Sequence, residues 1–255
     1  MRPIVAAGHG RRRAAHGGQL PAAVSPPTAA RPGALPPGPA VRRTGRSGIL
    51  GGMPGHAIAS EPPPAPRHPF GPYRVSLVCL GNICRSPTAE VVLREELARA
   101  GLSGRVEVDS SGTGNWHVGG PMDPGARAEL AARGYDGSGH RARQFDRSWF
   151  GGYDLVVAMD RQNLADLRRM APDRATARER IRLLRSFDPA ADGAARPAAG
   201  RTDRDPYDGD VPDPYHGSAA EYALAFDLVQ AAASGLAAQL AVLISGDDGS
   251  GAGER

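Results

Sequence analysis

The sequence predicts a single α/β domain, a four-stranded parallel sheet flanked by helices on both faces. Short apolar runs typical of strands alternate along residues 71–245 with segments whose apolar residues recur at helical spacing. This alternation implies a parallel sheet covered on both sides. At roughly 175 residues, the segment has the size of one ordinary domain.

The first strand is expected at residues 75–79, where Val75, Leu77 and Val78, continuing to Leu80, form a buried run. A helix should follow, with Ser86 as its N-cap and Pro87 at its first helical position. In a parallel sheet, the loop between them lies at the carboxyl end of a strand, where such sheets bind ligands.

The remaining elements are assigned in chain order from the same patterns. We expect strands at 106–109, 155–158 and 181–184, helices at 123–133 and 161–170, and a long Ala/Leu-rich helix at 218–244.

The loop after the first strand is bracketed by Cys79 and, six positions on, Arg85. All 31 basic residues of the chain are arginines, so this spacing alone is weak evidence. The context is more specific, because Gly81 and Asn82 tolerate the unusual backbone angles of a tight loop. The loop N–H groups and the positive end of the following helix would face one point. The sequence therefore predicts a phosphate-binding loop after the first strand.

The same environment favours a reactive cysteine. A thiol at a helix N-terminus beside a cation is stabilised as the thiolate, so Cys79 would be the nucleophile. The planar guanidinium of Arg85 would bind two phosphate oxygens. Cys84 has two possible roles: it packs in the loop, or it protects Cys79 by forming a reversible disulfide under oxidation.

Five motifs in order extend this pattern along the chain. With the loop, they make the sequence resemble the low-molecular-weight protein tyrosine phosphatase family, as a bacterial member, over roughly residues 73–243. They are Ser110-Ser-Gly-Thr-Gly-Asn-Trp-His-Val-Gly, Asp123-Pro, Gly139-His-Arg-Ala-Arg-Gln, Val157-Ala-Met-Asp-Arg-Gln-Asn and Asp213-Pro-Tyr-His-Gly.

The resemblance implies that the general acid is the aspartate of an Asp-Pro-Tyr loop near the C-terminus. Two such tripeptides occur, beginning at Asp205 and Asp213. We favour Asp213 because it directly precedes the last helix, which Ser218 and Glu221 would open as a capping box. Asp205 lies in an Ala/Gly/Arg/Asp-rich segment, about 190–210, that is typical of a solvated loop insertion.

Further roles follow from the same resemblance. Ser86 would donate its hydroxyl to the Cys79 sulfur, and Asn82 and His140 would hold the loop in its strained shape. Trp116 and Tyr215 would form the walls of a slot for a flat phosphoaryl ring. The predicted phosphate-binding and supporting set is Leu80, Gly81, Asn82, Ile83, Cys84, Ser86 and His140.

Two positions bear on substrate and regulation. Family members often have a second tyrosine after the first in the acid loop, a phosphorylation site in some of them, and here His216 occupies that position. Relatives that act on phosphoarginine tend to have threonine at the position of Ile83. A bulky aliphatic residue there favours phosphotyrosine.

The predicted activity is hydrolysis of phosphotyrosine through a phosphocysteine intermediate, without a cofactor or metal. The acidic residues between 203 and 213 lack the ligand pattern of a calcium loop. The alternative is an arsenate reductase on the same scaffold that uses an external thiol. We expect a monomer acting on phosphotyrosine-containing proteins, such as a bacterial tyrosine kinase or its substrates.

Composition separates the N-terminal segment from the domain. Residues 1–70 hold nine arginines and one acid, a charge of +8, so the remainder carries 4 − 8 = −4. The segment is rich in Pro, Gly, Ala and Arg, and we expect it to be disordered, as we do residues 246–255. Arg11-Arg-Arg is not followed by an apolar stretch, so we expect no cleaved signal and no membrane span. Basic tails are commonly just solvated, so we expect no specific nucleic-acid partner. Two cysteines confined to one loop are typical of a cytoplasmic protein.

Overall fold

The computed structural model describes residues 61–190 and 207–247. Its four strands form one parallel sheet in the order β2-β1-β3-β4, which confirms the predicted fold class. The strands are β1 (Tyr73–Cys79), β2 (Val106–Gly112), β3 (Leu155–Ala158) and β4 (Ile181–Leu183).

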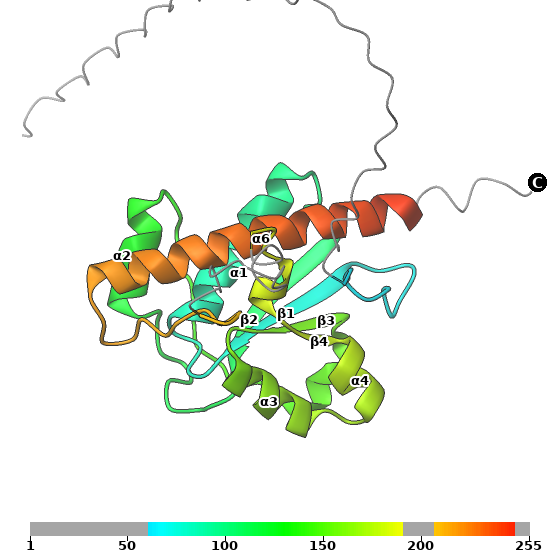
Figure 1. Cartoon of the computed structure of the whole chain (residues 1–255), viewed down its shortest axis with the longest axis horizontal. Coiled ribbons are helices and arrows are strands. Elements are labelled where there is room, and N and C mark those ends of the chain that lie inside the picture. The colour runs from blue at the N-terminus through cyan, green and yellow to red at the C-terminus, as the bar shows by residue number, and fades with distance from the viewer. Residues whose placement is uncertain (1–60, 191–206, 248–255) are drawn as a thin grey trace, which may run out of the picture. The chain divides into compact units, whose positions relative to one another are not determined.

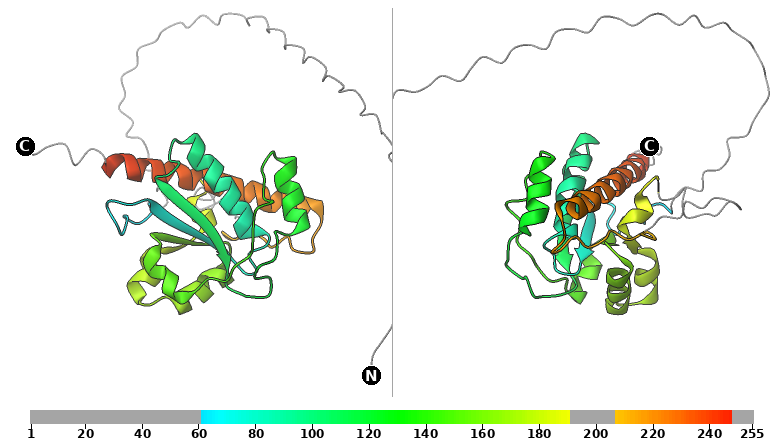
Figure 2. Two further views of the ribbon diagram at one scale, coloured as in Figure 1. Left: turned by 180° about the vertical axis from the view of Figure 1, so that it is seen from behind. Right: turned by 60° about the vertical axis from the view of Figure 1, so that its left-hand side comes forward.

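Helices cover both faces of the sheet (Figures 1 and 2). One face carries α1 (Arg85–Arg99), α2 (Pro124–Ala132) and α6 (Ala219–Asp247); the other carries α3 (Arg161–Met170) and α4 (Arg174–Glu179). Short 3-10 helices, η1 (Arg147–Gly152) and η2 (Leu184–Phe187), complete the described elements.

Alternation along the central strands divides the core into two clusters. In β1, Val75 and Leu77 belong to the cluster that includes α1, α2 and α6, whereas Val78 belongs to the cluster beside α3. In β3, Val157 belongs to the first of these clusters and Val156 to the second. Successive side chains of a strand point to opposite faces, so both sides of the central pair are buried.

Two local predictions at the first strand were wrong. Leu80 lies beyond β1 and is 42% exposed, because the chain has already turned into the loop. Ser86 is not the N-cap of α1 and Pro87 is not its first residue, because the helix begins at Arg85 with Cys84 in the cap position. The Ser86 hydroxyl donates to the Cys79 sulfur, as the family resemblance implied.

The other boundaries lie close to the predicted ones, and α3 matches residue for residue. Aspartates cap the flanking helices: Asp123 accepts from two amides at the start of α2, and Asp160 accepts from Asn163 N at the start of α3. Short elements such as α4, η1 and η2 were not predicted.

Contacts with the domain begin before the predicted boundary at residue 71. Arg67 N donates to Asp154 Oδ1 over 2.5 Å, and the Tyr73 hydroxyl donates to Pro64 O over 2.9 Å. Arg182 pairs with Glu61 at 2.5 Å. Residues 61–70 therefore contact the domain, while residues 1–60 and 248–255 lie outside the described part of the chain.

Helix α6 is the longest described element. By length and mean hydropathy it is a candidate membrane span, but this is weak evidence, because the core helix of a folded domain meets the same criteria. Here Phe226, Val229, Leu236 and Leu240 are buried against the domain, and Gly235 approaches the carbonyl oxygen of Phe187. Helix α6 is therefore a core helix in this structure.

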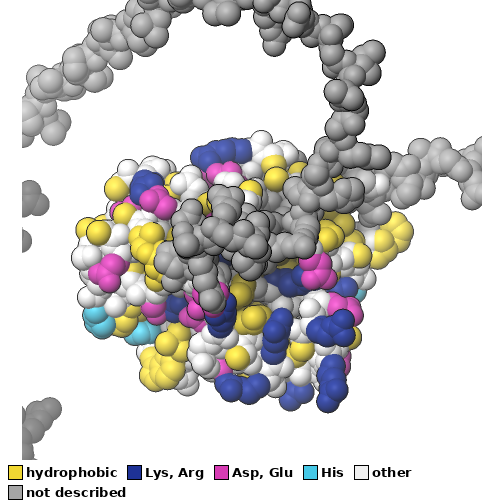
Figure 3. Space-filling view, in the orientation of Figure 1, with side chains coloured by type: hydrophobic (Ala, Val, Ile, Leu, Met, Phe, Trp, Pro, Cys, Tyr) yellow, Lys and Arg dark blue, Asp and Glu magenta, His cyan; other side chains and the backbone are white. Residues whose placement is uncertain are grey.

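The outer surfaces of α3 and α4 are rich in arginine. Figure 3 shows dark blue side chains gathered over these helices, and Arg168, Arg169, Arg174 and Arg178 are exposed there. This basic surface lies on the α3–α4 face of the sheet, opposite α6.

Candidate active site

The loop between β1 and α1 surrounds the sulfur of Cys79 with hydrogen-bond donors. Asn82 N donates to Sγ over 3.2 Å and the Ser86 hydroxyl over 3.0 Å. Cys79 itself is only 2% exposed. Because the start of α1 adjoins the same loop, donors and the positive helix end together can stabilise negative charge at this point.

A buried network holds the loop in shape. Asn82 is fully buried and adopts φ 56°, a left-handed conformation that asparagine tolerates. Its Nδ2 donates to Ser86 Oγ over 3.0 Å and to Ser110 Oγ over 2.9 Å. His140 Nε2 lies 2.7 Å from the Asn82 carbonyl oxygen. The structure thus brings together Asn82, Ser86 and His140, three of the residues predicted from sequence.

Arg85 is paired with two carboxylates. Its Nη1 lies 2.5 Å from Asp160 Oδ2 and its Nη2 lies 2.6 Å from Asp213 Oδ2. The Arg85 side chain is 4% exposed. Burial opposes its charge, but Cys79, Asp213 and Asp160 outweigh that effect and raise the pKa of Arg85 above its ordinary value. Arg85 is therefore a permanent cation beside the sulfur.

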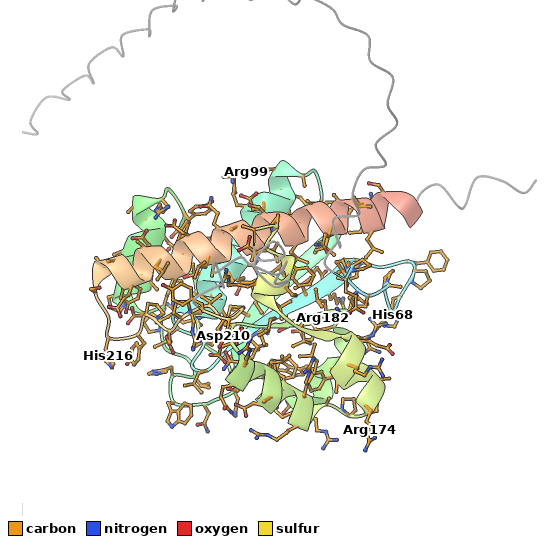
Figure 4. The ribbon with its side chains drawn as sticks, viewed as in Figure 1. His68, Arg99, Arg174, Arg182, Asp210 and His216 are labelled. Atoms are coloured by element: carbon orange, nitrogen blue, oxygen red, sulfur yellow. The ribbon has the colours of Figure 1, made fainter. Side chains whose placement is uncertain are left out.

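The acid loop reaches the site from near the C-terminus. Val211 N donates to Met159 O over 2.8 Å, and Arg85 Nη1 donates to Val211 O over 3.3 Å. The Asp213 side chain is 42% exposed. Figure 4 shows Asp210, from the same segment, near the start of α3. Asp205, the rejected alternative, lies outside the described residues.

Cys84 differs from Cys79 in its surroundings. Both cysteines are free thiols, and Cys84 is 4% exposed. Burial raises the pKa of the Cys84 thiol, and the charges of Asp123 and Asp213 raise it further. Cys84 is therefore a neutral thiol, and its protective disulfide stays a prediction.

The predicted slot walls are exposed at the loop surface. Trp116 is 71% exposed and Tyr215 40% exposed. The ring that contacts Tyr215 in a T-shaped arrangement, at 5.9 Å between centroids, belongs to His117 rather than Trp116. Trp116 packs over Gly114, where a Cβ atom would meet its ring at 1.8 Å. His216, labelled in Figure 4, adopts φ 63°, and its ring also contacts Tyr215, at 3.8 Å between centroids.

The rest of the predicted set lines the loop. Gly81 lies beneath His117, whose ring carbon is 3.0 Å from the Cβ position of Gly81. Ile83 is 9% exposed, and its carbonyl oxygen accepts a bond of 2.9 Å from Asp123 N. Leu80 accepts a 2.9 Å bond from Gly114 N.

Sequence reasoning missed two residues of the site. Asp160 binds Arg85, and its position directly after a buried strand was a signal that could have been used. His117 lies next to Trp116 in a quoted motif, but nothing local indicates which of the two rings turns toward Tyr215. Among the residues that the structure describes, no group of three His, Cys, Asp or Glu side chains could hold a metal ion.

Comparison with known proteins agrees with this geometry. The model of the family "Low molecular weight phosphotyrosine protein phosphatase" matches residues 74–243. A low molecular weight protein-tyrosine-phosphatase of Streptomyces coelicolor is 47% identical over 174 residues, covering 68% of this chain and 97% of that protein. Phosphatase A of Mycobacterium bovis is 39% identical over 165 residues, covering 65% of this chain and 90% of its own.

Solved structures show the same fold. YfkJ from Bacillus subtilis superposes with a TM-score of 0.54 at 33% identity, covering 67% of this chain and 95% of its own. A protein tyrosine phosphatase from Entamoeba histolytica superposes with a TM-score of 0.56 at 28% identity, covering 66% of this chain and 96% of its own. The chain therefore belongs to the low molecular weight phosphotyrosine protein phosphatase family and is a hydrolase of phosphotyrosine.

Proposed function

We propose that the enzyme hydrolyses phosphotyrosine in two steps through a phosphocysteine on Cys79. The observation that carries this proposal is the convergence of Asn82 N and the Ser86 hydroxyl on the Cys79 sulfur, beside the buried Arg85 guanidinium. Two donors and a cation stabilise the thiolate both as attacking group and as leaving group.

In the first step, the Cys79 thiolate attacks phosphorus and the bond from phosphorus to the tyrosine oxygen breaks. Asp213, as a carboxylic acid, gives its proton to that oxygen, so tyrosine leaves neutral. Two phosphate oxygens take the Arg85 donors that Asp213 and Asp160 occupy in this structure. Substrate binding therefore frees Asp213 from Arg85.

In the second step, water attacks the phosphocysteine. The Asp213 carboxylate accepts a proton from this water, the sulfur–phosphorus bond breaks, and inorganic phosphate leaves. The released thiolate regains the hydrogen bonds from Ser86 and Asn82. Tyr215 and His117, which contact each other, would flank the substrate ring together with Trp116.

The proposed substrates are phosphotyrosine-containing proteins, such as a bacterial tyrosine kinase or its targets. The proposed setting is a cytoplasmic monomer. An arsenate reductase relying on an external thiol is not favoured, because the family model and the relatives reported above are phosphatases.

The test is steady-state hydrolysis of phosphotyrosine, phosphoserine and phosphoarginine peptides. We expect turnover of the phosphotyrosine peptide, its loss in Cys79→Ser, and a decrease of about 10²- to 10⁴-fold in Asp213→Asn. Asp205→Asn is the matched control, because it changes the other Asp-Pro-Tyr tripeptide. Equal losses in the two aspartate variants would contradict the role of Asp213.

Covalent trapping tests the intermediate separately. Wild type, quenched in acid during turnover of a labelled phosphopeptide, should carry label on the peptide containing Cys79. Asp213→Asn should also accumulate label with a substrate whose leaving group needs no proton. Label on another residue, or none, would overturn the phosphocysteine mechanism.

A further inference from the structure

Arg143 lies outside the phosphate loop, on the segment between α2 and η1. Its backbone runs along the free edge of β2: Gly112 N donates to Arg143 O over 2.9 Å, and Phe145 N donates to Gly112 O over 2.8 Å. This pairing extends the sheet beyond β2 by an isolated parallel bridge between Gly112 and Gln144. The position of Arg143 is thus fixed relative to the end of β2.

The Arg143 amide meets the side chain that shapes the loop. Arg143 N donates to Asn82 Oδ1 over 2.9 Å, while Asn82 Nδ2 donates to Ser86 Oγ and Ser110 Oγ. Ser86 in turn donates to Cys79 Sγ. A continuous chain of hydrogen bonds therefore leads from Arg143 through Asn82 and Ser86 to the sulfur.

The Arg143 side chain also binds Ser110, the residue whose hydroxyl accepts a hydrogen bond from Asn82 Nδ2. Its Nε donates to Ser110 O over 2.8 Å, and its Nη2 lies 2.6 Å from Asp109 Oδ1. The guanidinium also lies over the Trp149 ring at 5.0 Å. Tyr153 supports this arrangement by donating its hydroxyl to Asp109 Oδ2 over 2.5 Å.

These contacts secure both ends of the Asn82 carboxamide from one residue. The Arg143 backbone fixes the oxygen end, and the Arg143 side chain fixes the strand residue whose hydroxyl receives the nitrogen end. Asn82 needs such restraint, because its backbone adopts the left-handed conformation and its side chain is fully buried. The Arg143 side chain itself is 39% exposed, so the hydrogen bonds that restrain Asn82 start from a residue near the surface.

We propose that Arg143 is a positioning residue for the nucleophile, acting through Asn82 and Ser86 on the Cys79 thiolate without contact with substrate. The inference rests on the proposed role of Cys79. Without the guanidinium, Ser110 and the segment carrying the Arg143 amide become free to shift, and the Ser86 hydroxyl is held less firmly toward sulfur. The thiolate then loses part of its stabilisation.

The direct test measures the pH dependence of Cys79 alkylation by iodoacetate, with the modified cysteine identified by peptide mass. Arg143→Met keeps the backbone amide and the packing over Trp149 but removes the guanidinium donors. We expect the midpoint of alkylation to rise by roughly 0.5 to 1 pH unit. Arg127→Met, at an exposed arginine of α2, is the control and should leave the midpoint unchanged.

Two further variants separate positioning from the effect of charge. Arg143→Lys retains the positive charge but cannot pair with Asp109 and bind Ser110 O in the same fork. If Arg143 acts by positioning, Arg143→Lys should reverse less than half of the rise in the alkylation midpoint that Arg143→Met causes. In an Asn82→Ala background, Arg143→Met should add no further shift, because the connecting side chain is already absent.

Kinetics supply an independent readout. In Arg143→Met we expect kcat for a phosphotyrosine peptide to fall about tenfold with KM changed less than twofold, since substrate contacts are intact. Asp109→Asn, which loosens the guanidinium from one side, should shift the alkylation midpoint in the same direction by a smaller amount.

The proposal is overturned if Arg143→Met leaves the alkylation midpoint within 0.1 unit of wild type, if lysine restores it fully, or if the shift persists in Asn82→Ala. Alkylation needs no turnover, so this result is distinguishable from failure of the proposed function, which Cys79→Ser kinetics decide. A merely structural role would lower thermal stability without moving the midpoint.

Discussion

Arg85 and Asp213, 128 positions apart in the sequence, form an ion pair of 2.6 Å in this structure. The proposed phosphate-binding cation and the proposed acid are therefore each other's partners before a substrate binds. An incoming phosphate must replace the Asp213 carboxylate at Arg85.

Removing the Asp213 charge should strengthen inhibition by inorganic phosphate, because the anion no longer competes with a carboxylate. The Asp213 side chain is 42% exposed, so solvent screens the pair and a gain of about 1 kcal/mol, or roughly fivefold in the inhibition constant, is expected. The measurement is phosphate inhibition of residual aryl phosphate turnover in Asp213→Asn. Asp210→Asn is the control, because it removes a nearby charge whose carboxylate accepts a hydrogen bond from Arg161 N. An equal change in the inhibition constant in both variants would show that net charge, and not the pairing of Asp213 with Arg85, causes the effect.

Asp160 has two functions that substitution can separate. It pairs with Arg85 and caps α3 through Asn163 N at 2.6 Å. Asparagine caps a helix as well as aspartate, so Asp160→Asn should keep the capping stability of α3 while removing a carboxylate that competes with phosphate for Arg85, which should lower KM for the peptide. Asp160→Ala should also lose about 1 kcal/mol of stability. Urea unfolding and peptide kinetics on both variants give the comparison, and equal stability of the two would argue against the capping role.

We expect that position 235 cannot accommodate even the methyl group of alanine without loss of stability. A Cβ atom there would lie 1.9 Å from Phe187 O, a backbone atom that cannot easily move. We expect Gly235→Ala to destabilise the fold by about 2–3 kcal/mol, despite the higher helix propensity of alanine. Gly246→Ala, in the same helix but with open space around the Cβ position, should be neutral or slightly stabilising. Thermal unfolding of the pair isolates the packing effect from propensity.

The start of α6 should show a defined pH dependence. The backbone N–H and hydroxyl of Ser218 donate to Glu221 Oε2 over 2.7 and 2.8 Å, and these bonds lower the pKa of Glu221. A carboxylate whose pKa is lowered by folding stabilises the fold at pH values above its pKa in the unfolded state. This stabilisation is lost as the pH falls through its pKa in the folded state. The difference in melting temperature between wild type and Glu221→Gln should therefore be present at pH 7 and shrink toward pH 3. A constant difference across this range would contradict the assignment.

The elements of the fold could be predicted where local pattern is strong. Helix α3 begins and ends where the sequence indicated, because Asp160 caps it after a buried strand. Ser86 was misplaced as an N-cap because α1 begins one residue earlier, at Arg85, whereas its hydrogen bond to the Cys79 sulfur, which the family resemblance implied, is present in the structure. The pairing of Arg85 with Asp160 and Asp213 depends on strand order and on the return of the chain after β4, so the residues were visible in the sequence but their contacts were not.

The distance along the chain between Cys79 and Asp213 also has a consequence for synthesis on the ribosome. At about 5–20 residues per second, the 213 − 79 = 134 intervening positions take roughly 7 to 27 seconds to translate. During that interval the nascent chain contains the cysteine and Arg85 but neither Asp213 nor α6, whose buried face covers α1. A polypeptide terminated before residue 213 would therefore contain the proposed nucleophile and phosphate-binding arginine but lack both the proposed acid and the helix that completes the core.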